Sequence, residues 1–449
     1  MYNPFNKDIS ELDRSDLQLL IDNEIAEGWY IEYKSKVPET SSGKLDNLKI
    51  VKSLSSFANT KGGWIFWGVE CDKNAATKIV GFDISSYDNF QDQVSRIISS
   101  NVNPLPIYHF REISIDTNCI VFIIQVEESP TPPYITSQGV IYQRENNESK
   151  PVKERYILEK LKEKTDLYIQ GIEDFCHIDL AETRGQADSD QPYLELYLYP
   201  IPFNGYYFTD FYESDFFEYL SSVFYDNSVT INENNLSLGM NFNSILCSNG
   251  SIIIRSLNKN NLIYKGMTVE LFANGGLKFL CPLSTFSLNS VPKYYENSAI
   301  IDYLRNEYDA YSTDLETHMK MIDGTDIIYT IMILITKYQK ILQHFGCQLD
   351  LRYRAKLTGM WRKFVFIDSA NYLEKIKLYN IPCSPKDEIE MPQFANGYSY
   401  ELIKDDFSFL FLAKDILLGI GLPNAASVDI IEAFQKGIKK YENRFTVSE

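Results

Sequence analysis

Residues 57–70 read FANTKGGWIFWGVE, and this stretch sets the N-terminal fold. Its first residues end an apolar helix, and Gly62 and Gly63 supply a tight loop because glycine adopts left-handed turns without steric cost. Trp64 to Val69 is rich in aromatic and β-branched residues, which is typical of a buried strand. The strand stops at Glu70. The stretch therefore predicts a helix, a loop and a core strand with a carboxylate at its exit.

A second, acidic strand is predicted upstream, over Trp29 to Lys34. Residues two apart on a strand share a face, so we expect Glu32 and Lys34 to point the same way. Glu27 lies at an odd offset from Glu32 and must reach it from the loop or helix end before the strand. Lys34 either neutralises a bound phosphate or is an ordinary solvated lysine at a strand edge.

Several carboxylates are therefore expected to converge on neighbouring strand ends. The candidate ligands are Glu27, Glu32, Glu70 and Asp72. Because Mg²⁺ and Mn²⁺ prefer carboxylate and water oxygens, this arrangement predicts a divalent-metal site.

The combination resembles the AlbA-like domain of the Schlafen family, a mixed sheet-and-helix fold. The matching residues in chain order are Glu27, Glu32, Tyr33 and Lys34; Phe57 to Gly63; Gly68 to Glu70; Pro130 to Tyr134; and Tyr142 to Arg144. Their order and spacing fit the family over residues 1–165.

The resemblance implies a metal-dependent endoribonuclease that acts on RNA, with tRNA as one candidate substrate and Mg²⁺ or Mn²⁺ as cofactor. Nuclease-active members use two glutamates five residues apart and a later aspartate, so Glu27, Glu32 and Glu70 would be catalytic with Lys34 beside them. Glutamate replaces the aspartate at position 70, which lengthens that side chain by one methylene. A role in phage defence would fit this activity.

Other residues have two possible roles. Asn59, Gly62 and Gly63 either present backbone N–H groups to the phosphates of ATP or form only a turn. Three basic side chains could contact the phosphates of a nucleic-acid backbone: Lys36, Lys61 and Arg144. The alternative for the two lysines is that they are ordinary surface charges, and the alternative for Arg144 is a structural salt bridge. Two further functions remain open: a non-catalytic regulator that binds nucleic acid or ATP, and a scaffold subunit.

The charge balance limits how this chain can bind nucleic acid. Its 449 residues carry a formal net charge of −18. Residues 1–164 hold 19 Lys and Arg against 24 Asp and Glu, whereas the remainder holds 24 against 37. Long-range attraction cannot dominate, so the binding of RNA or of another single-stranded nucleic acid must be local, through a groove, a metal or an assembly. The acidic C-terminal half could instead bind a basic protein partner, such as a product of the same operon.

The cysteines and the hydropathy favour a cytoplasmic protein with no membrane contact. Seven scattered cysteines form no Cys-x-x-Cys pair and are accompanied by only four histidines, so a structural zinc site is not expected. No stretch reaches membrane-spanning length. The chain carries one copy of a lobe that animal Schlafens carry twice, so we expect a homodimer or a higher homo-oligomer.

The remaining sequence suggests three domains: 1–165, a strand-rich α+β domain at 166–295, and an all-α region at 296–449. The helices expected in the last region are Ala299–Tyr308, Ile327–His344, Ala370–Leu378, Phe407–Leu418 and Val428–Tyr441. A basic cluster between Arg352 and Phe364 either stacks on RNA or belongs to a helix that packs on an acidic neighbour.

Overall fold

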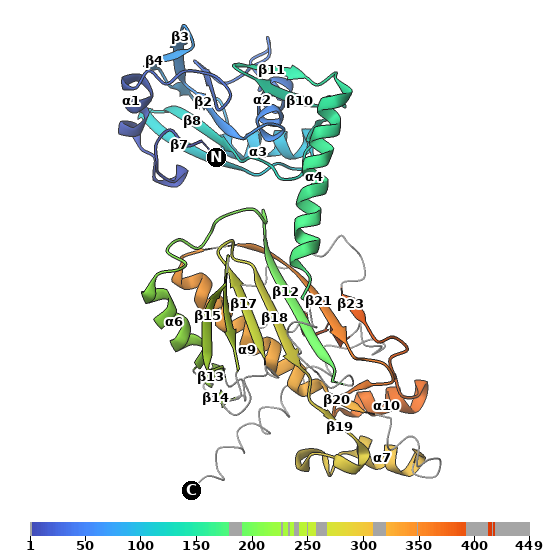
Figure 1. Ribbon diagram of the computed structural model, residues 1–449. Helices are drawn as coiled ribbons and strands as arrows, with labels where there is room; N and C mark the ends of the chain where they lie inside the picture. The colour runs from blue at the N-terminus through green and yellow to red at the C-terminus, as the bar shows by residue number, and fades with distance from the viewer. Residues whose placement is uncertain are drawn as a thin grey trace. The chain divides into compact units, whose positions relative to one another are not determined.

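The computed structural model describes residues 2–178, 191–225, 228–231, 234–237, 242–248, 250–256, 267–308, 320–347, 349–391, 412–414 and 416–417. The chain divides into two compact units, residues 1–173 and 174–449. Both units combine helices with strands, which confirms the mixed α+β class (Figure 1). In the described ranges, no helix is long and apolar enough to cross a membrane.

The N-terminal unit is built on a five-stranded sheet. Strand β1 (Ile31–Lys34) runs parallel to β2 (Gly63–Trp67), and β2 runs antiparallel to β8 (Cys119–Val126). β8 also pairs with β5 (Phe82–Asp83) and β7 (Tyr108–Asp116). A parallel pair needs a crossover connection, and helix α2 (Asn47–Ala58) supplies it between β1 and β2.

The alternation of side chains along β2 creates two cores. Ile65 and Trp67 join one buried cluster with residues of α2 and α3 (Phe90–Asn101). Trp64 and Phe66 join a second cluster with residues of η1 (Ile9–Glu11) and α1 (Arg14–Asp22). Because both faces are covered, the strand is apolar throughout, as its sequence predicts.

Short antiparallel strand pairs surround this sheet, and two of them lie next to the candidate site. β3 (Val69–Asp72) pairs with β4 (Ala75–Ile79), and β10 (Tyr142–Glu145) pairs with β11 (Glu148–Pro151). β6 (Val102–Asn103) pairs with β9 (Ile135–Thr136), and helix α4 (Arg155–Phe175) follows.

The predicted core strand is shorter than expected. It ends at Trp67, and Gly68 with a φ of +100° separates it from β3. Glu70 therefore lies within the exposed β3–β4 hairpin and not at the exit of the core strand.

The second unit contains a seven-stranded antiparallel sheet in the order β15-β16-β17-β18-β12-β21-β23. Its strands are β12 (Tyr193–Ile201), β15 (Ser244–Ser248), β16 (Ser251–Arg255), β17 (Thr268–Phe272), β18 (Leu277–Pro282), β21 (Asp350–Thr358) and β23 (Ile389–Met391). Helices α6 (Ser214–Tyr225) and α9 (Gly324–His344) share its buried core (Figure 1).

Smaller elements complete this unit. They are β13 (Ser228–Ile231), β14 (Asn234–Ser237), β19 (Thr285–Phe286), η2 (Leu288–Ser290), η3 (Lys293–Tyr295), α7 (Ala299–Tyr308), β20 (Met321–Asp323), β22 (Phe364–Phe366) and α10 (Ala370–Tyr379). Three of the expected C-terminal helices are confirmed as α7, α9 and α10. The expected helix Phe407–Leu418 lies largely, and Val428–Tyr441 entirely, outside the described residues.

The all-α prediction for 296–449 is wrong where the structure describes that region. Four strands occur there, and β21 pairs with β12 along nine registered positions from Tyr193↔Thr358 to Ile201↔Asp350, so one sheet spans the expected boundary at 295/296. Arg352, Arg354 and Lys356 of the basic cluster lie on β21, not on a helix. They alternate with buried residues such as Leu351 and Tyr353, and this period of two marks a strand. The boundary expected at 165/166 falls inside α4.

Candidate functional site

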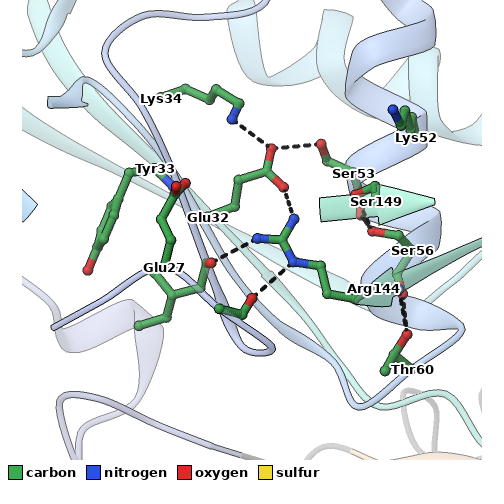
Figure 2. A network of polar contacts seen from close by, with 12 residues as sticks. Glu27, Glu32, Tyr33, Lys34, Lys52, Ser53, Ser56, Thr60, Arg144 and Ser149 are labelled. Carbon is green, nitrogen blue, oxygen red and sulfur yellow. Dashed lines mark hydrogen bonds and ion pairs between the residues drawn. The ribbon is translucent and has the colours of Figure 1, made fainter. Parts of the chain in front are cut away.

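A buried ion pair between Glu32 and Arg144 forms the centre of the candidate site (Figure 2). Glu32 is 4% exposed and Arg144 is 1% exposed. Arg144 Nη1 donates to Glu32 Oε2 at 2.5 Å, while its Nε and Nη2 donate to the carbonyl oxygens of Gly28 and Ile31, both at 3.0 Å. Buried charges require such partners, because an unpaired charge away from water is very costly.

The second oxygen of Glu32 is also occupied. Glu32 Oε1 accepts a hydrogen bond from Ser53 Oγ at 2.8 Å and lies 3.3 Å from Lys34 Nζ. Figure 2 shows Arg144, Ser53 and Lys34 pointing toward this carboxylate from β10, α2 and β1. Two cations therefore surround one carboxylate, and Lys34 remains 48% exposed.

One polar face of α2 connects the site to the β10–β11 hairpin. Ser56 Oγ lies 2.7 Å from Ser149 Oγ, and Thr60 Oγ1 accepts a hydrogen bond from the Arg144 backbone N–H at 2.9 Å. Lys52 lies over the Tyr142 ring, with Nζ 5.6 Å from the ring centroid. The spacing of Ser53 and Ser56 on α2, with Thr60 just past the end of the helix, is the sequence signal that could have indicated this connection.

Glu27 lies beside β1, as its position before the strand suggests. Its Oε1 accepts a hydrogen bond from the Tyr33 backbone N–H at 2.7 Å. Glu27 also interacts with Cys71 of β3: partial burial raises the pKa of the Cys71 thiol, the Glu27 carboxylate adds to that rise, and Lys34 opposes it. Sequence reasoning missed this cysteine because it sought a carboxylate on β3.

Glu70 and Asp72 are exposed on the β3–β4 hairpin. Glu70 lies opposite Lys78, and the pairing of β3 with β4 shifts register between Glu70 and Cys71. Such a bulge re-aims side chains relative to a regular strand.

The residues present do not fit a metal ion in this arrangement. Throughout the part of the chain that the structure describes, no three His, Cys, Asp or Glu side chains are grouped so that they could hold one. Both oxygens of Glu32 already contact donors, and one oxygen of Glu27 accepts from backbone. The expected convergence of Glu27, Glu32, Glu70 and Asp72 is therefore not seen here.

The Asn59 and Gly62–Gly63 motif packs within the domain. The Asn59 amide donates to the carbonyls of Tyr134 and Tyr142, both at 2.9 Å, and accepts from the Tyr134 N–H at 2.7 Å. A Cβ on Gly62 would lie 2.6 Å from backbone atoms of Glu128 and Val126. The backbone N–H groups of Asn59 and Gly62 also donate within the chain, to the carbonyls of Ser55 at 2.9 Å and Phe57 at 3.0 Å, so neither is available to an ATP phosphate in this arrangement.

Lys36 and Lys61 are exposed, one after β1 and the other in the loop after α2. For both lysines and for Lys52, no ion-pair partner is found among the described residues. They can therefore contact a ligand without first breaking a salt bridge.

Comparison with known proteins identifies the family to which this domain is similar. Residues 27–153 match the sequence model described as Schlafen, AlbA_2, and this part of the chain is a Schlafen AlbA_2 domain. The Poxin-Schlafen protein of Monkeypox virus (strain Zaire-96-I-16) is 42% identical over 57 residues, which cover 13% of this chain and 10% of that protein.

Among solved structures, the crystal structure of the DIP2311 protein from Corynebacterium diphtheriae is similar over 29% of this chain and 26% of its own, with 18% identity. Its TM-score is 0.22, which supports no argument about the fold. The chain thus spans only a small part of each of these relatives.

Proposed function

We propose that the N-terminal unit binds RNA through a basic surface, formed by Lys34 and Lys52, beside the Glu32–Arg144 pair. One observation carries the proposal: the buried Arg144 already pairs with Glu32, and the exposed Lys34 lies 3.3 Å from the same carboxylate, so Lys34 adds a positive charge beside a neutral pair. The exposed Lys34 can meet a phosphate while Glu32 is already neutralised. The match to a Schlafen AlbA_2 domain supports the same ligand class, with tRNA as one candidate.

The charge of the whole chain determines what kind of binding to expect. A protein with a net charge of −18 repels nucleic acid at long range. Affinity must then come from short-range contacts by Lys34, Lys52 and the exposed Lys36 and Lys61. Each lysine–phosphate contact on a single strand changes the slope of log affinity against log salt by about 0.7.

The test is a fluorescence-anisotropy titration of a labelled RNA of about 20 nucleotides between about 50 and 200 mM salt. We expect the double variant Lys34→Ala/Lys52→Ala to bind about tenfold more weakly at low salt, with a salt slope shallower by about 1.4. The matched control is Lys160→Ala on α4, since Lys160 lies 5.0 Å from the Tyr156 ring much as Lys52 lies over Tyr142. Equal losses in control and double variant, or no binding by the wild type, would contradict the proposal.

Metal-dependent cleavage of RNA is a second candidate, supported by the match of residues 27–153 to a Schlafen AlbA_2 domain and by two family-matching glutamates, Glu27 and Glu32, at one strand. It would require these carboxylates to leave their present partners, because Glu27 accepts from the Tyr33 backbone N–H and Glu32 accepts from Ser53 and Arg144. The test is a gel assay for cleavage of total tRNA with Mn²⁺ or Mg²⁺, stopped by EDTA. Glu70→Ala is the informative variant because Glu70 is exposed and its loss leaves the core intact. Intact RNA in the wild-type reaction would remove this candidate without affecting the binding proposal.

A further inference from the structure

The N-terminal unit contains a cavity of about 840 Å³ between α3 and the segment that leads into α2. We call it the α2–α3 cavity, and its lining residues come from two stretches of chain, 40–48 and 86–97. Small-molecule sites in proteins typically measure about 300–1,000 Å³, so the cavity is large enough for a ligand. Neither Lys34 nor Lys52 is among its lining residues, and the cavity is therefore separate from the basic surface described above.

Part of the lining is apolar and belongs to the core of the domain. Leu45, Tyr87 and Ile97 line the cavity, and all three are half-buried and pack against the buried cluster around α2 and α3. The Tyr87 hydroxyl donates to Glu39 Oε1 at 2.5 Å, which ties the two sides of the cavity together. These contacts order the lining before a ligand arrives, and this reduces the entropy that binding must lose.

The exposed part of the lining is cationic. Lys44 and Arg96 both line the cavity, and within the described ranges no ion-pair partner is found for either of them. The carboxylate of Asp46 also lines it, but Asp46 Oδ2 already lies 3.2 Å from Lys49 Nζ. With Glu39 included, three cations face two carboxylates, so the cavity has an excess of positive charge in a chain whose net charge is −18.

Two amide side chains, from Asn47 and Gln93, complete the chemistry of the lining. Amides both donate and accept hydrogen bonds, which suits the polar edge of a nucleobase. The anion of a fatty acid would leave them without partners, and unpaired polar groups weaken binding. A planar ring with polar edges that carries a phosphate matches the apolar, amide and cationic parts of the lining together.

We propose that the α2–α3 cavity binds a nucleoside monophosphate, with its phosphate on Lys44 and Arg96 and its base against Leu45, Tyr87 and Ile97. The same chemical group occurs as a free nucleotide and as the 5′-phosphorylated end of an RNA. The site uses neither the Asn59 and Gly62–Gly63 loop nor the basic surface, so it adds a second ligand site to the domain.

The test is isothermal titration calorimetry of the full chain with the ribonucleoside 5′-monophosphates, the matching nucleosides and ribose 5-phosphate. We expect at least one monophosphate to bind about tenfold more tightly than its nucleoside, because only the monophosphate offers an anion to both cations. We expect a similar advantage over ribose 5-phosphate, which lacks the base that would cover the apolar lining.

Variants locate the ligand in the cavity. Lys44→Ala/Arg96→Ala should lower the affinity for the monophosphate to that for the nucleoside and leave the nucleoside unaffected. Lys153→Ala/Lys162→Ala is the matched control, because it removes the same charge from two exposed lysines outside the lining. Leu48→Glu changes a 47% exposed side chain of the lining and should also weaken monophosphate binding, by repulsion. Thermal unfolding verifies that each variant is folded.

A short RNA with a 5′-phosphate or a 5′-hydroxyl distinguishes the two sources of the ligand. Tighter binding of the phosphorylated RNA that is lost in Lys44→Ala/Arg96→Ala identifies the RNA end. Equal binding of the two RNAs, or binding of neither, alongside a bound monophosphate identifies the free nucleotide. Equal wild-type affinity for monophosphates and nucleosides, or equal losses in the double variant and its control, overturns the site and leaves RNA binding by Lys34 and Lys52 standing.

Discussion

Among single residues, Glu32 has a structural role that its sequence motif conceals. Its carboxylate is buried, and its partners Arg144 and Ser53 are contributed by β10 and α2. Removing it leaves the Arg144 guanidinium buried without its ionic partner. Loss of RNA cleavage in Glu32→Ala would therefore be expected from unfolding alone, and it cannot by itself identify a catalytic residue.

We predict that Glu32→Ala lowers the free energy of unfolding by about 3–5 kcal/mol, because it leaves the buried Arg144 guanidinium without its ionic partner. Arg144→Ala should cost less than Glu32→Ala, because Lys34 and Ser53 still contact the Glu32 carboxylate. The double variant Glu32→Gln/Arg144→Met should cost less than the sum of the two single changes. Urea unfolding followed by circular dichroism measures all three. Arg155→Ala, which breaks an exposed pair with Glu159, is the control and should cost less than about 0.5 kcal/mol.

A Glu32→Ala variant as stable as this control would contradict the buried-pair interpretation. It would mean that the carboxylate is solvated in solution and free to bind a ligand, which would favour the metal-dependent candidate.

Among the elements, the loop between α2 and β2 depends on close packing as well as on backbone conformation. Gly62 has a φ of +69° and packs against the backbone of Val126 and Glu128 at the end of β8. Its N–H also donates to the Phe57 carbonyl at 3.0 Å, which closes the C-terminal end of α2. This loop positions both β2 and the α2 face that carries Ser53.

We predict that Gly62→Ala destabilises the protein by at least about 2 kcal/mol more than Gly43→Ala. Gly43 has a similar φ of +75°, but no atom lies within 4 Å of the place that an alanine Cβ would occupy there, so its substitution reports the strain of a positive φ alone. The additional loss in Gly62→Ala is the cost of overpacking. Equal melting temperatures for the two variants would show that the loop shifts to make room for the added methyl group. That result would favour the ATP-binding interpretation of this loop.

For the molecule as a whole, the distribution of charge and the number of AlbA_2 domains affect the oligomeric state that we expect. The match to the Schlafen AlbA_2 domain covers residues 27–153, and the acidic excess lies mainly after residue 164. A single near-balanced lobe has few phosphate contacts of its own. Two such lobes brought together would double the basic surface that a single RNA can contact.

We predict that the protein is a homodimer whose mass in solution is twice the chain mass of 51.9 kDa. Light scattering coupled to size-exclusion chromatography at about 150 mM salt measures it, since screening at that ionic strength weakens repulsion between acidic chains. A monomer that binds RNA with full affinity would refute the need for a second copy. Co-elution of a basic protein from the native host would instead favour the scaffold alternative.

The amino-acid sequence was sufficient for the elements whose signals are local. The apolar period of α2, the Gly62–Gly63 turn and the aromatic run of β2 are each encoded within a few residues, and α7 has the bounds that its sequence predicts, Ala299–Tyr308. Local signals suffice here because helix periodicity and turn conformation depend on near neighbours.

Which side chains meet follows only from the three-dimensional packing. Arg144 lies 112 residues from Glu32, and the packing of the β10–β11 hairpin on α2 brings the two charges together. On β3 it is Cys71 that interacts with Glu27, and the pairing of β3 with β4 shifts register between Glu70 and Cys71. The pairing of β12 with β21 joins regions that composition alone would separate. These outcomes depend on strand register and long-range packing, and a shift of one residue in register reverses the face that each side chain occupies.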